Sequence, residues 1–340
     1  MYSHISHLKI LLCAVLFLFG ITSCSMMYDD LEDCPSGVWV KLEMTYKGKY
    51  IAPNFADDLN NVAIWVFDQN GTYIDKYTEN GENLKKNNNT MLLPIDPGKY
   101  KMVVWSGTED ANYEVTDMIS GISTINDLKV RVARNQNNRQ GNKLSSLWHG
   151  QIENAEVKKS RYTHLTVGLI KNTNTIISVL QVSDKSLDSD DYTFEIIAEN
   201  GYMGYDNKLL QDTPANVNYD AYFLETALVS NQDNDGNETS LSVSRAELNT
   251  LRLMSNDNTR FVVTEKSTGV NILNINLTEY LLLTREHYNG SNGTTMSPQA
   301  YLDYEDMYRV VFFLVPSGNS YLLTEMEING WIVRINNTEL

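Results

Sequence analysis

Apolar and polar residues alternate along many short segments of this chain. Val38, Val40 and Leu42 are separated by mostly polar neighbours, which is the period of two expected for a strand with one buried face. Residues 62–67 form a continuous apolar run, and the Gln69-Asn70-Gly71 that follows is a hairpin-turn signal. Further strands are expected at residues 72–77, 90–95, 99–105, 128–132, 155–157, 164–169, 176–182, 192–197, 241–243, 261–264, 272–277, 310–315 and 331–335. Helical content should be low, with the best candidates at residues 244–248 and 299–305.

Length and composition fit two strand-rich domains. The chain has 340 residues, 42% of them hydrophobic, and domains usually hold about 100–200 residues. The polar stretch Lys158-Lys159-Ser160 precedes a second series of alternating segments. We therefore expect an all-β chain of two tandem β-sandwiches, residues 37–160 and 161–340. The Asn- and Asp-rich segments 200–218 and 230–238 are expected to be surface loops.

The first 23 residues have the features of a secretion signal. Residues 10–21 form an apolar run of 12, which is too short to span a bilayer as a helix and is typical of a signal peptide. Ile21-Thr22-Ser23-Cys24 after it resembles the lipobox of bacterial lipoproteins. This predicts cleavage between Ser23 and Cys24 and lipid attachment at Cys24, where several acyl chains give stable anchoring in the outer membrane. The alternative is an ordinary signal peptide with an incidental cysteine.

Residues 24–36 are expected to be an acidic tether. Asp29, Asp30, Glu32 and Asp33 resemble signals that send lipoproteins to the cell surface, and they also fit a solvated spacer repelled by an anionic membrane. Cys34 would be the only free thiol of the mature chain, either buried or paired between chains. The formal net charge of −16, without clustered basic residues, argues against a nucleic-acid partner.

Catalytic and metal-binding patterns are weak, so we predict no enzymatic activity, no cofactor and no metal site. His149, His164 and His287 remain after removal of the leader, and none has a metal-ligand spacing. The carboxylates of residues 188–191 are interpreted as solvated turns, with a glycosidase pair as the alternative. Asn231–Asn237 resembles the first half of a calcium loop, but Ser242 stands where the twelfth-position glutamate is needed. A polar loop is the favoured interpretation.

Several aromatic side chains could stack on sugars. Trp65, Trp105, Trp148 and Tyr202 are the candidates, and each fits a buried core position better.

The order of several motifs resembles the fimbrial anchor and minor-subunit lipoproteins of Bacteroidia, the FimB type of type V pili. The motifs are the acidic run ending in Cys34-Pro35, the Gly98-x-Tyr100 and Trp105-x-Gly107 segment, Leu147-Trp148-His149-Gly150, residues 299–305 and residues 328–334. The resemblance implies two transthyretin-like β-sandwiches, no catalysis, and binding of shaft pilins or other minor subunits by β-strand addition.

One feature distinguishes this chain from shaft pilins, which the resemblance implies are activated by a protease that cuts after arginine. The first arginine after Cys24 is Arg131, so such a cut cannot release the strand expected at residues 38–46. We therefore expect an anchor or accessory subunit that keeps its first strand. The competing interpretations are a surface or tip adhesin that binds a glycan or host protein, and a carbohydrate-active lipoprotein.

Overall fold

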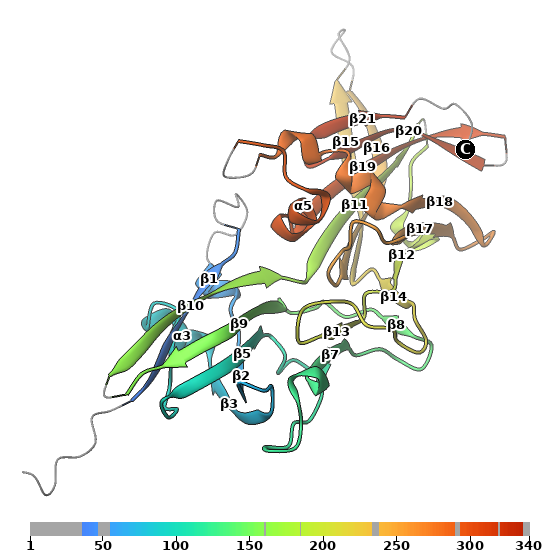
Figure 1. Cartoon of the computed structure of the whole chain (residues 1–340). Helices are drawn as coiled ribbons and strands as arrows, with labels where there is room; N and C mark the ends of the chain where they lie inside the picture. The colour runs from blue at the N-terminus through green and yellow to red at the C-terminus, as the bar shows by residue number, and fades with distance from the viewer. Residues whose placement is uncertain are drawn as a thin grey trace, which may run out of the picture.

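The computed structural model describes residues 36–46, 55–159, 161–183, 185–232, 238–289, 293–318 and 320–335. Strands dominate these residues, and the expected all-β class is confirmed (Figure 1). The leader and Cys24, the acidic cluster and Cys34 lie outside the described residues, as does most of the candidate calcium loop.

The first half of the chain folds into one seven-stranded sheet that is wrapped into two layers. The strand order is β3-β2-β5-β9-β10-β1-β4. The bounds are β1 Gly37–Met44, β2 Val62–Asp68, β3 Tyr73–Glu79, β4 Thr90–Leu93, β5 Gly98–Ser106, β9 Trp148–Val157 and β10 Tyr162–Lys171. Because β10 pairs with β9 only at Ile170 and Lys171, its remaining length is free to turn over the other layer with β1. Side chains of both layers meet in a single apolar core.

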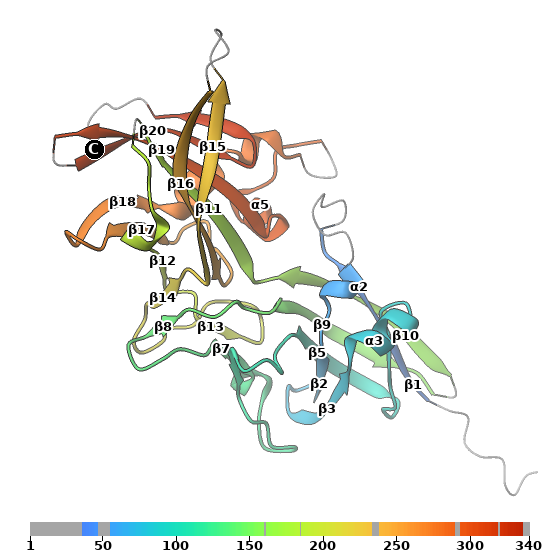
Figure 2. The same ribbon diagram turned by 180° about the vertical axis from the view of Figure 1, so that it is seen from behind.

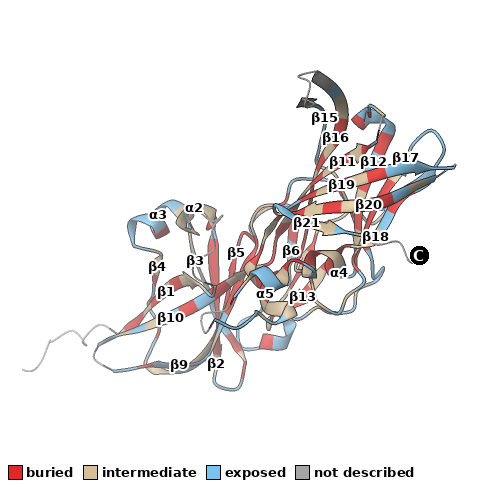
Figure 3. Cartoon of the chain, turned by 90° about the horizontal axis from the view of Figure 1, so that it is seen from above, coloured by how far each residue is buried: buried red, intermediate tan, exposed pale blue. Residues whose placement is uncertain are grey.

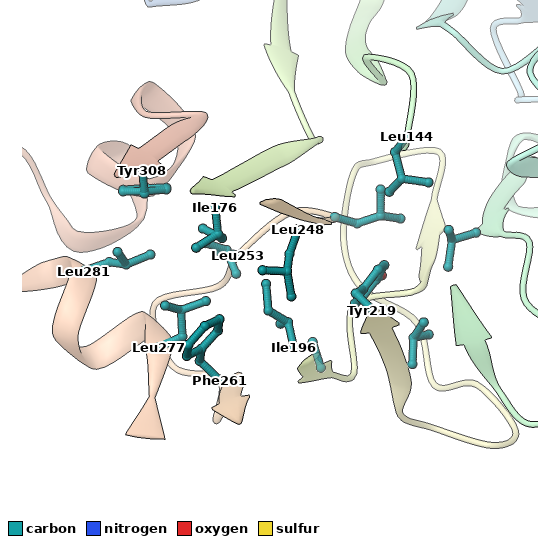
Figure 4. Close-up of a cluster of buried hydrophobic side chains, with 14 of the residues drawn as sticks. Leu144, Ile176, Ile196, Tyr219, Leu248, Leu253, Phe261, Leu277, Leu281 and Tyr308 are labelled. Carbon is teal, nitrogen blue, oxygen red and sulfur yellow. The ribbon is translucent and has the colours of Figure 1, made fainter. Parts of the chain in front are cut away.

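The second half contains two sheets that face each other. The six-stranded sheet has the order β15-β16-β11-β19-β20-β21, and the five-stranded sheet the order β18-β17-β12-β14-β8. The bounds are β8 Arg139–Gln140, β11 Asn174–Val182, β12 Tyr192–Ala198, β14 Val217–Asp220, β15 Phe223–Gln232, β16 Glu238–Thr250, β17 Arg260–Glu265, β18 Val270–Asn276, β19 Met307–Ser317, β20 Ser320–Ile328 and β21 Trp331–Arg334. Ile176 and Leu248 of one sheet pack with Ile196 and Phe261 of the other in the core of Figure 4.

A small sheet and several short helices complete the fold. β6 (Tyr113–Val115), β7 (Lys129–Val132) and β13 (Tyr202–Gly204) form a three-stranded sheet that links the two halves of the chain. The α-helices are α2 Phe55–Asp58, α3 Gly81–Lys86, α4 Leu277–Leu282 and α5 Pro298–Tyr304, and the 3-10 helices are Ile125–Asp127, Ser189–Asp191 and Arg285–His287. The helix expected near residues 299–305 is confirmed as α5.

The helix expected at residues 244–248 is wrong, because these residues belong to β16. Ser244, Ala246 and Leu248 are buried, whereas Arg245 and Glu247 between them are partly exposed, so the segment alternates as a strand does. The segment expected as a loop at 200–218 contains β13 and the first residues of β14. Of the segment expected at 230–238, the described residues 230–232 belong to β15 and residue 238 begins β16.

Strand membership also differs from the simple division at residue 160. That position lies between β9 and β10, two strands of the same sheet, and the first strand in sequence of the six-stranded sheet is β11. β7, expected to complete the first domain, pairs with β13 instead, and β8 joins the five-stranded sheet through β14. β7 and β8, which lie in the first half of the sequence, therefore pair with strands of the second half.

The molecule is elongated, with the seven-stranded sheet at one end and the two facing sheets of the second half at the other (Figures 1 and 2). The Gly37 end of β1 lies at one extremity, and the far end of the β15–β16 hairpin lies at the other. Seen from above, buried residues follow the inner strands of both ends (Figure 3).

Candidate functional site

Strand β1 is paired along both of its edges. On one side it runs parallel to β10, in register from Gly37 opposite Tyr162 to Met44 opposite Leu169. On the other side it is antiparallel to β4, from Val38 opposite Leu93 to Lys41 opposite Thr90. The ladder continues past β4, because the Leu42 N–H donates to the Asn89 carbonyl at 2.8 Å. No edge of β1 is therefore available to another strand.

The inner face of β1 fills an apolar groove. Val38, Val40 and Leu42 are 0%, 0% and 1% exposed. They share a core with residues of the opposite layer: Ile64 and Val66 of β2, and Met102 and Val104 of β5. Removing this strand would uncover all of these side chains, and truncating a buried side chain of this size alone costs about 2–5 kcal/mol.

The start of β1 is shaped by a glycine. Gly37 has φ +147°, and a Cβ at this position would lie 2.9 Å from the Leu93 carbonyl oxygen. This close approach lets the chain enter the sheet directly beside the end of β4. On the outer face, the Trp39 ring packs edge-on against Tyr162 of β10, with 6.2 Å between ring centroids. The entry of the chain into the fold is thus fixed by backbone geometry and packing.

The end of β10 connects the two halves through a buried lysine. The Lys171 ammonium lies 2.8 Å from an Asp58 carboxylate oxygen and 3.1 Å from an Asp306 oxygen. Burial opposes its charge, but the two carboxylates, Asp306 first, outweigh that effect and raise its pKa above the usual value. Asp58 also accepts hydrogen bonds from Ser146 and from the Trp148 indole. This network ties α2, β9 and β10 to the start of β19.

A second set of polar contacts lies beside it. Arg252 makes a bidentate ion pair with Asp303, both bonds at 2.8 Å, and donates to the Asn207 carbonyl at 2.7 Å. The side chains of Asn172 and Asn207 donate to each other, at 2.6 and 3.1 Å. Bidentate arginine pairs and reciprocal amide bonds fix orientation as well as distance. The Arg252 contacts orient Asp303 and Asn207 within the second half, and the Asn172–Asn207 pair ties the segment directly after β10 to that half.

His149 belongs to this joint between the two halves. Its ring packs on Trp105 at 4.5 Å between centroids, and Nε2 lies 2.7 Å from the Tyr205 carbonyl oxygen. Because a carbonyl oxygen only accepts, Nε2 carries the proton of the neutral ring. Burial lowers the pKa of His149 to about 4. Gly150 beside it passes so close to β10 that a Cβ would lie 2.6 Å from the Gly168 carbonyl oxygen.

The candidate sugar-stacking residues are mostly core. Trp65, Trp105 and Trp148 are buried, as favoured from the sequence, and the half-buried Tyr202 ring is covered by the Arg131 guanidinium at 4.5 Å. A cavity of about 680 Å³ lies beside α3, and its lining is largely polar and acidic, including Asn60, Asn61 and Asp110. No aromatic ring is among the described residues that line it.

In the described part of the chain, the other histidines and carboxylates considered from the sequence do not gather into a metal-binding cluster. No three His, Cys, Asp or Glu side chains gather there as a metal site. None of the helices described is long and apolar enough to cross a bilayer. His149 lies in β9, His164 in β10 and His287 in a 3-10 helix, where its ring stacks on Trp331. Asp188 caps the 3-10 helix Ser189–Asp191, and Asp190 and Asp191 lie within it.

Two long strands, β15 and β20 (Ser320–Ile328), are not among those expected from the sequence, and β15 is the longer of them. Five of the seven residues 223–229 are apolar but do not alternate, so no period of two marks them. The signal available was the hairpin, because this apolar run is followed by the polar segment 230–238 and by the strand expected at 241–243.

Comparison with known proteins shows which family this fold and sequence match. The sequence profile of the fimbrillin-A-associated anchor proteins Mfa1 and Mfa2 matches residues 31–337. The chain belongs to this family. Its members are structural proteins of the fimbrium, so membership implies association with fimbrial subunits at the cell surface.

Individual relatives agree with this family. The minor fimbrium anchoring subunit Mfa2 of Porphyromonas gingivalis is 24% identical over 347 residues, covering 99% of this chain and 98% of the relative. A Bacteroides thetaiotaomicron protein assigned as an adhesin is 31% identical, with a TM-score of 0.77, over 90% of this chain and 100% of that one. A second protein of that organism, assigned to polysaccharide binding, is also 31% identical, with a TM-score of 0.75 over 88% and 98% of the two chains. The crystal structure of P. gingivalis Mfa2 shares the fold, with a TM-score of 0.64 at 19% identity over 88% of this chain and 99% of that one.

Proposed function

We propose that this chain is the lipid-anchored base subunit of a fimbrium, held in the outer membrane through Cys24 and bound to fimbrial subunits by strand addition. The observation that carries the proposal is the position of β1. It is the first described strand after Cys24, it is paired on both edges, and its inner face is buried. A base subunit needs a lipid that stays joined to a folded body, and this arrangement supplies one.

The distribution of arginines supports the same role. The first arginine of the chain is Arg131, in β7, where its guanidinium lies 2.9 Å from Asp212. A cut at that position would leave β1 covalently joined to β2, β4 and β5. The strand would therefore stay in its own groove, and no empty groove would open for a neighbouring subunit. A chain of this kind ends a series of subunits on the membrane side.

One specific observation favours the second candidate function, that of an adhesin. Two relatives at 31% identity are assigned as an adhesin and as a polysaccharide-binding protein. The polar cavity beside α3 is the place where a glycan could bind, although sugar sites usually include an aromatic ring and this lining has none. Binding of the purified protein to a glycan array, lost on Asn61→Ala substitution, would favour this second function.

The base-subunit proposal is tested with an arginine-specific protease applied to membranes that carry the full lipoprotein. Wild type should stay on the membrane, because no arginine separates Cys24 from the β1–β5 unit. In the Lys49→Arg variant the protease can cut between β1 and α2, and the body should then leave the membrane once mild denaturant displaces β1.

Two outcomes of this experiment decide against the proposal. Release of the folded wild-type body near its N-terminus under native conditions would show that the first strand is not retained. Membrane attachment that persists in a Cys24→Ser variant would show that the lipid is not on that cysteine.

A further inference from the structure

Strand β15 has one edge that no other strand covers. It is the terminal strand of the six-stranded sheet, and its ten residues pair only with β16, from Phe223 opposite Glu247 to Gln232 opposite Glu238. Along the other edge, alternate N–H and C=O groups point away from the sheet. An extended segment placed there would find a ready row of donors and acceptors.

The other sheet edges in the described part of the chain are short, irregular or charged. β4 and β21 have four residues each, and β6, β8 and β13 have three or fewer. β3 carries Asp75 and Lys76, and its pairing with β2 contains a register shift. β18 pairs with β17 through a register shift as well. These features normally prevent unwanted strand pairing. By contrast, β15 is long, its pairing is regular, it contains neither proline nor lysine, and Glu225 is its only charged residue.

Apolar side chains stand on both faces of β15. The register with β16 places Leu224 and Leu228 on the face of the buried Ala246, and Phe223 and Val229 on the opposite face. Leu228 is 78% exposed, and the other three are each more than a third exposed. The only charged side chain of the strand, Glu225, forms an ion pair with Arg245 at 3.1 Å, and Arg245 also pairs with Glu247 of β16. Folding of this chain alone leaves this apolar surface in water, which is typical of an interaction site.

The position of the edge fits an external partner. The hairpin reaches the extremity of the molecule opposite the Gly37 end of β1, the end nearest in sequence to Cys24 (Figures 1 and 2). A lipid at Cys24 would therefore leave β15 on the side away from the membrane, where the rest of a fimbrium has to be.

We propose that the free edge of β15 is where an extended segment of a fimbrial subunit adds as a further strand. The segment would be uncharged, apolar on both faces, and up to about ten residues long, or about 33 Å at 3.3 Å per residue. A second copy of this chain fits the edge less well, because each copy carries a net charge of −16. This inference rests on the proposed function and names the site at which strand addition occurs.

The test is co-extraction of fimbrial subunits with the full-length lipoprotein from its own cells by mild detergent. The Leu224→Lys, Leu228→Lys double variant places two charges on one face of the edge and should reduce the recovered subunits at least tenfold. The matched control is Ile119→Lys, Ile122→Lys, because Ile119 and Ile122 are 59% and 73% exposed at a turn in the other half. This control should recover subunits as wild type does. Both variants replace exposed side chains, so their thermal unfolding should match wild type.

A photo-crosslinking amino acid at Val229 identifies the occupant directly. We expect covalent products with a fimbrial subunit, identified by mass spectrometry, and none from the same probe at Ile74 on the charged edge strand β3. Products formed only with a second copy of this chain would overturn the inference. Full co-extraction by the two-lysine variant would also overturn it while leaving the base-subunit role intact. Wild type that co-extracts no fimbrial subunit would contradict the proposed function itself, and this inference with it.

Discussion

Strands β1 and β15 are both rich in apolar residues, yet they differ in what covers them. β1 is paired on two edges, and Val38, Val40 and Leu42 are almost completely buried. β15 is paired on one edge, and Phe223, Leu228 and Val229 remain exposed. The two strands therefore have different roles. β1 completes the core of its own chain, and β15 leaves an edge to which a partner can add.

β1 and β15 also show two different reasons why a strand carries apolar side chains. In β1 the apolar side chains stabilise the fold, because folding removes them from water. In β15 the same residue types contribute little to folding, because they stay in water in the isolated chain. Stability alone explains the sequence of β1 and does not explain that of β15.

The largest effect on stability is expected from truncation in β1. Leu42→Ala should lower the free energy of unfolding by about 2–5 kcal/mol, because Leu42 is buried between two layers of strands. Leu228→Ala should change it by no more than about 0.5 kcal/mol, because that side chain is already solvated. Urea unfolding followed by circular dichroism measures both. Equal losses in the two variants would remove the distinction between the strands.

A smaller effect is expected at the joint between the two regions. The pKa of His149 is lowered by burial from its ordinary value of 6.5 to about 4. Between these two values the unfolded chain binds a proton that the folded chain does not, so stability falls as the pH falls through that window. At about pH 4, this difference in proton binding lowers the free energy of unfolding by about 3 kcal/mol.

The His149→Gln variant isolates this contribution. It keeps an N–H donor for the Tyr205 carbonyl and removes the titrating group, so it should lose less stability than wild type between neutral pH and about pH 4. Chemical unfolding at several pH values gives the difference. A constant gap between the two proteins across this range would mean that His149 does not hold its neutral form in the fold.

β1 is predicted from the sequence and β15 is not, and both outcomes have the same physical cause. A strand with one buried face alternates, and β1 was found by that alternation. An edge strand that is exposed on both faces has no such constraint, and residues 223–229 show no period. Ala246, Glu247 and Leu248 are good helix formers, yet residues 244–248 belong to β16 and not to the expected helix. Their burial alternates because the neighbouring strands of the sheet impose it.

The closure of β1 was only partly accessible from the sequence. The arginine-free stretch before Arg131 indicated a retained strand. The partner of that strand was not indicated, because β10 lies more than 120 residues later and pairs in parallel. Parallel pairing leaves no hairpin signal, since the two strands are not joined by a short turn. The placement of β10 in the first sheet is a property of the tertiary fold.

Hydrogen exchange of the full lipoprotein, alone and bound to fimbrial subunits, tests most directly the distinction between a closed first strand and an open distal edge. Peptides covering Gly37–Met44 should exchange slowly in both states, because β1 is bonded on both sides. Peptides covering Phe223–Gln232 should exchange faster in the free protein and gain protection on binding, as their outward N–H groups acquire partners. Binding that changes exchange in β1 and leaves β15 unchanged would contradict the assignment of both strands.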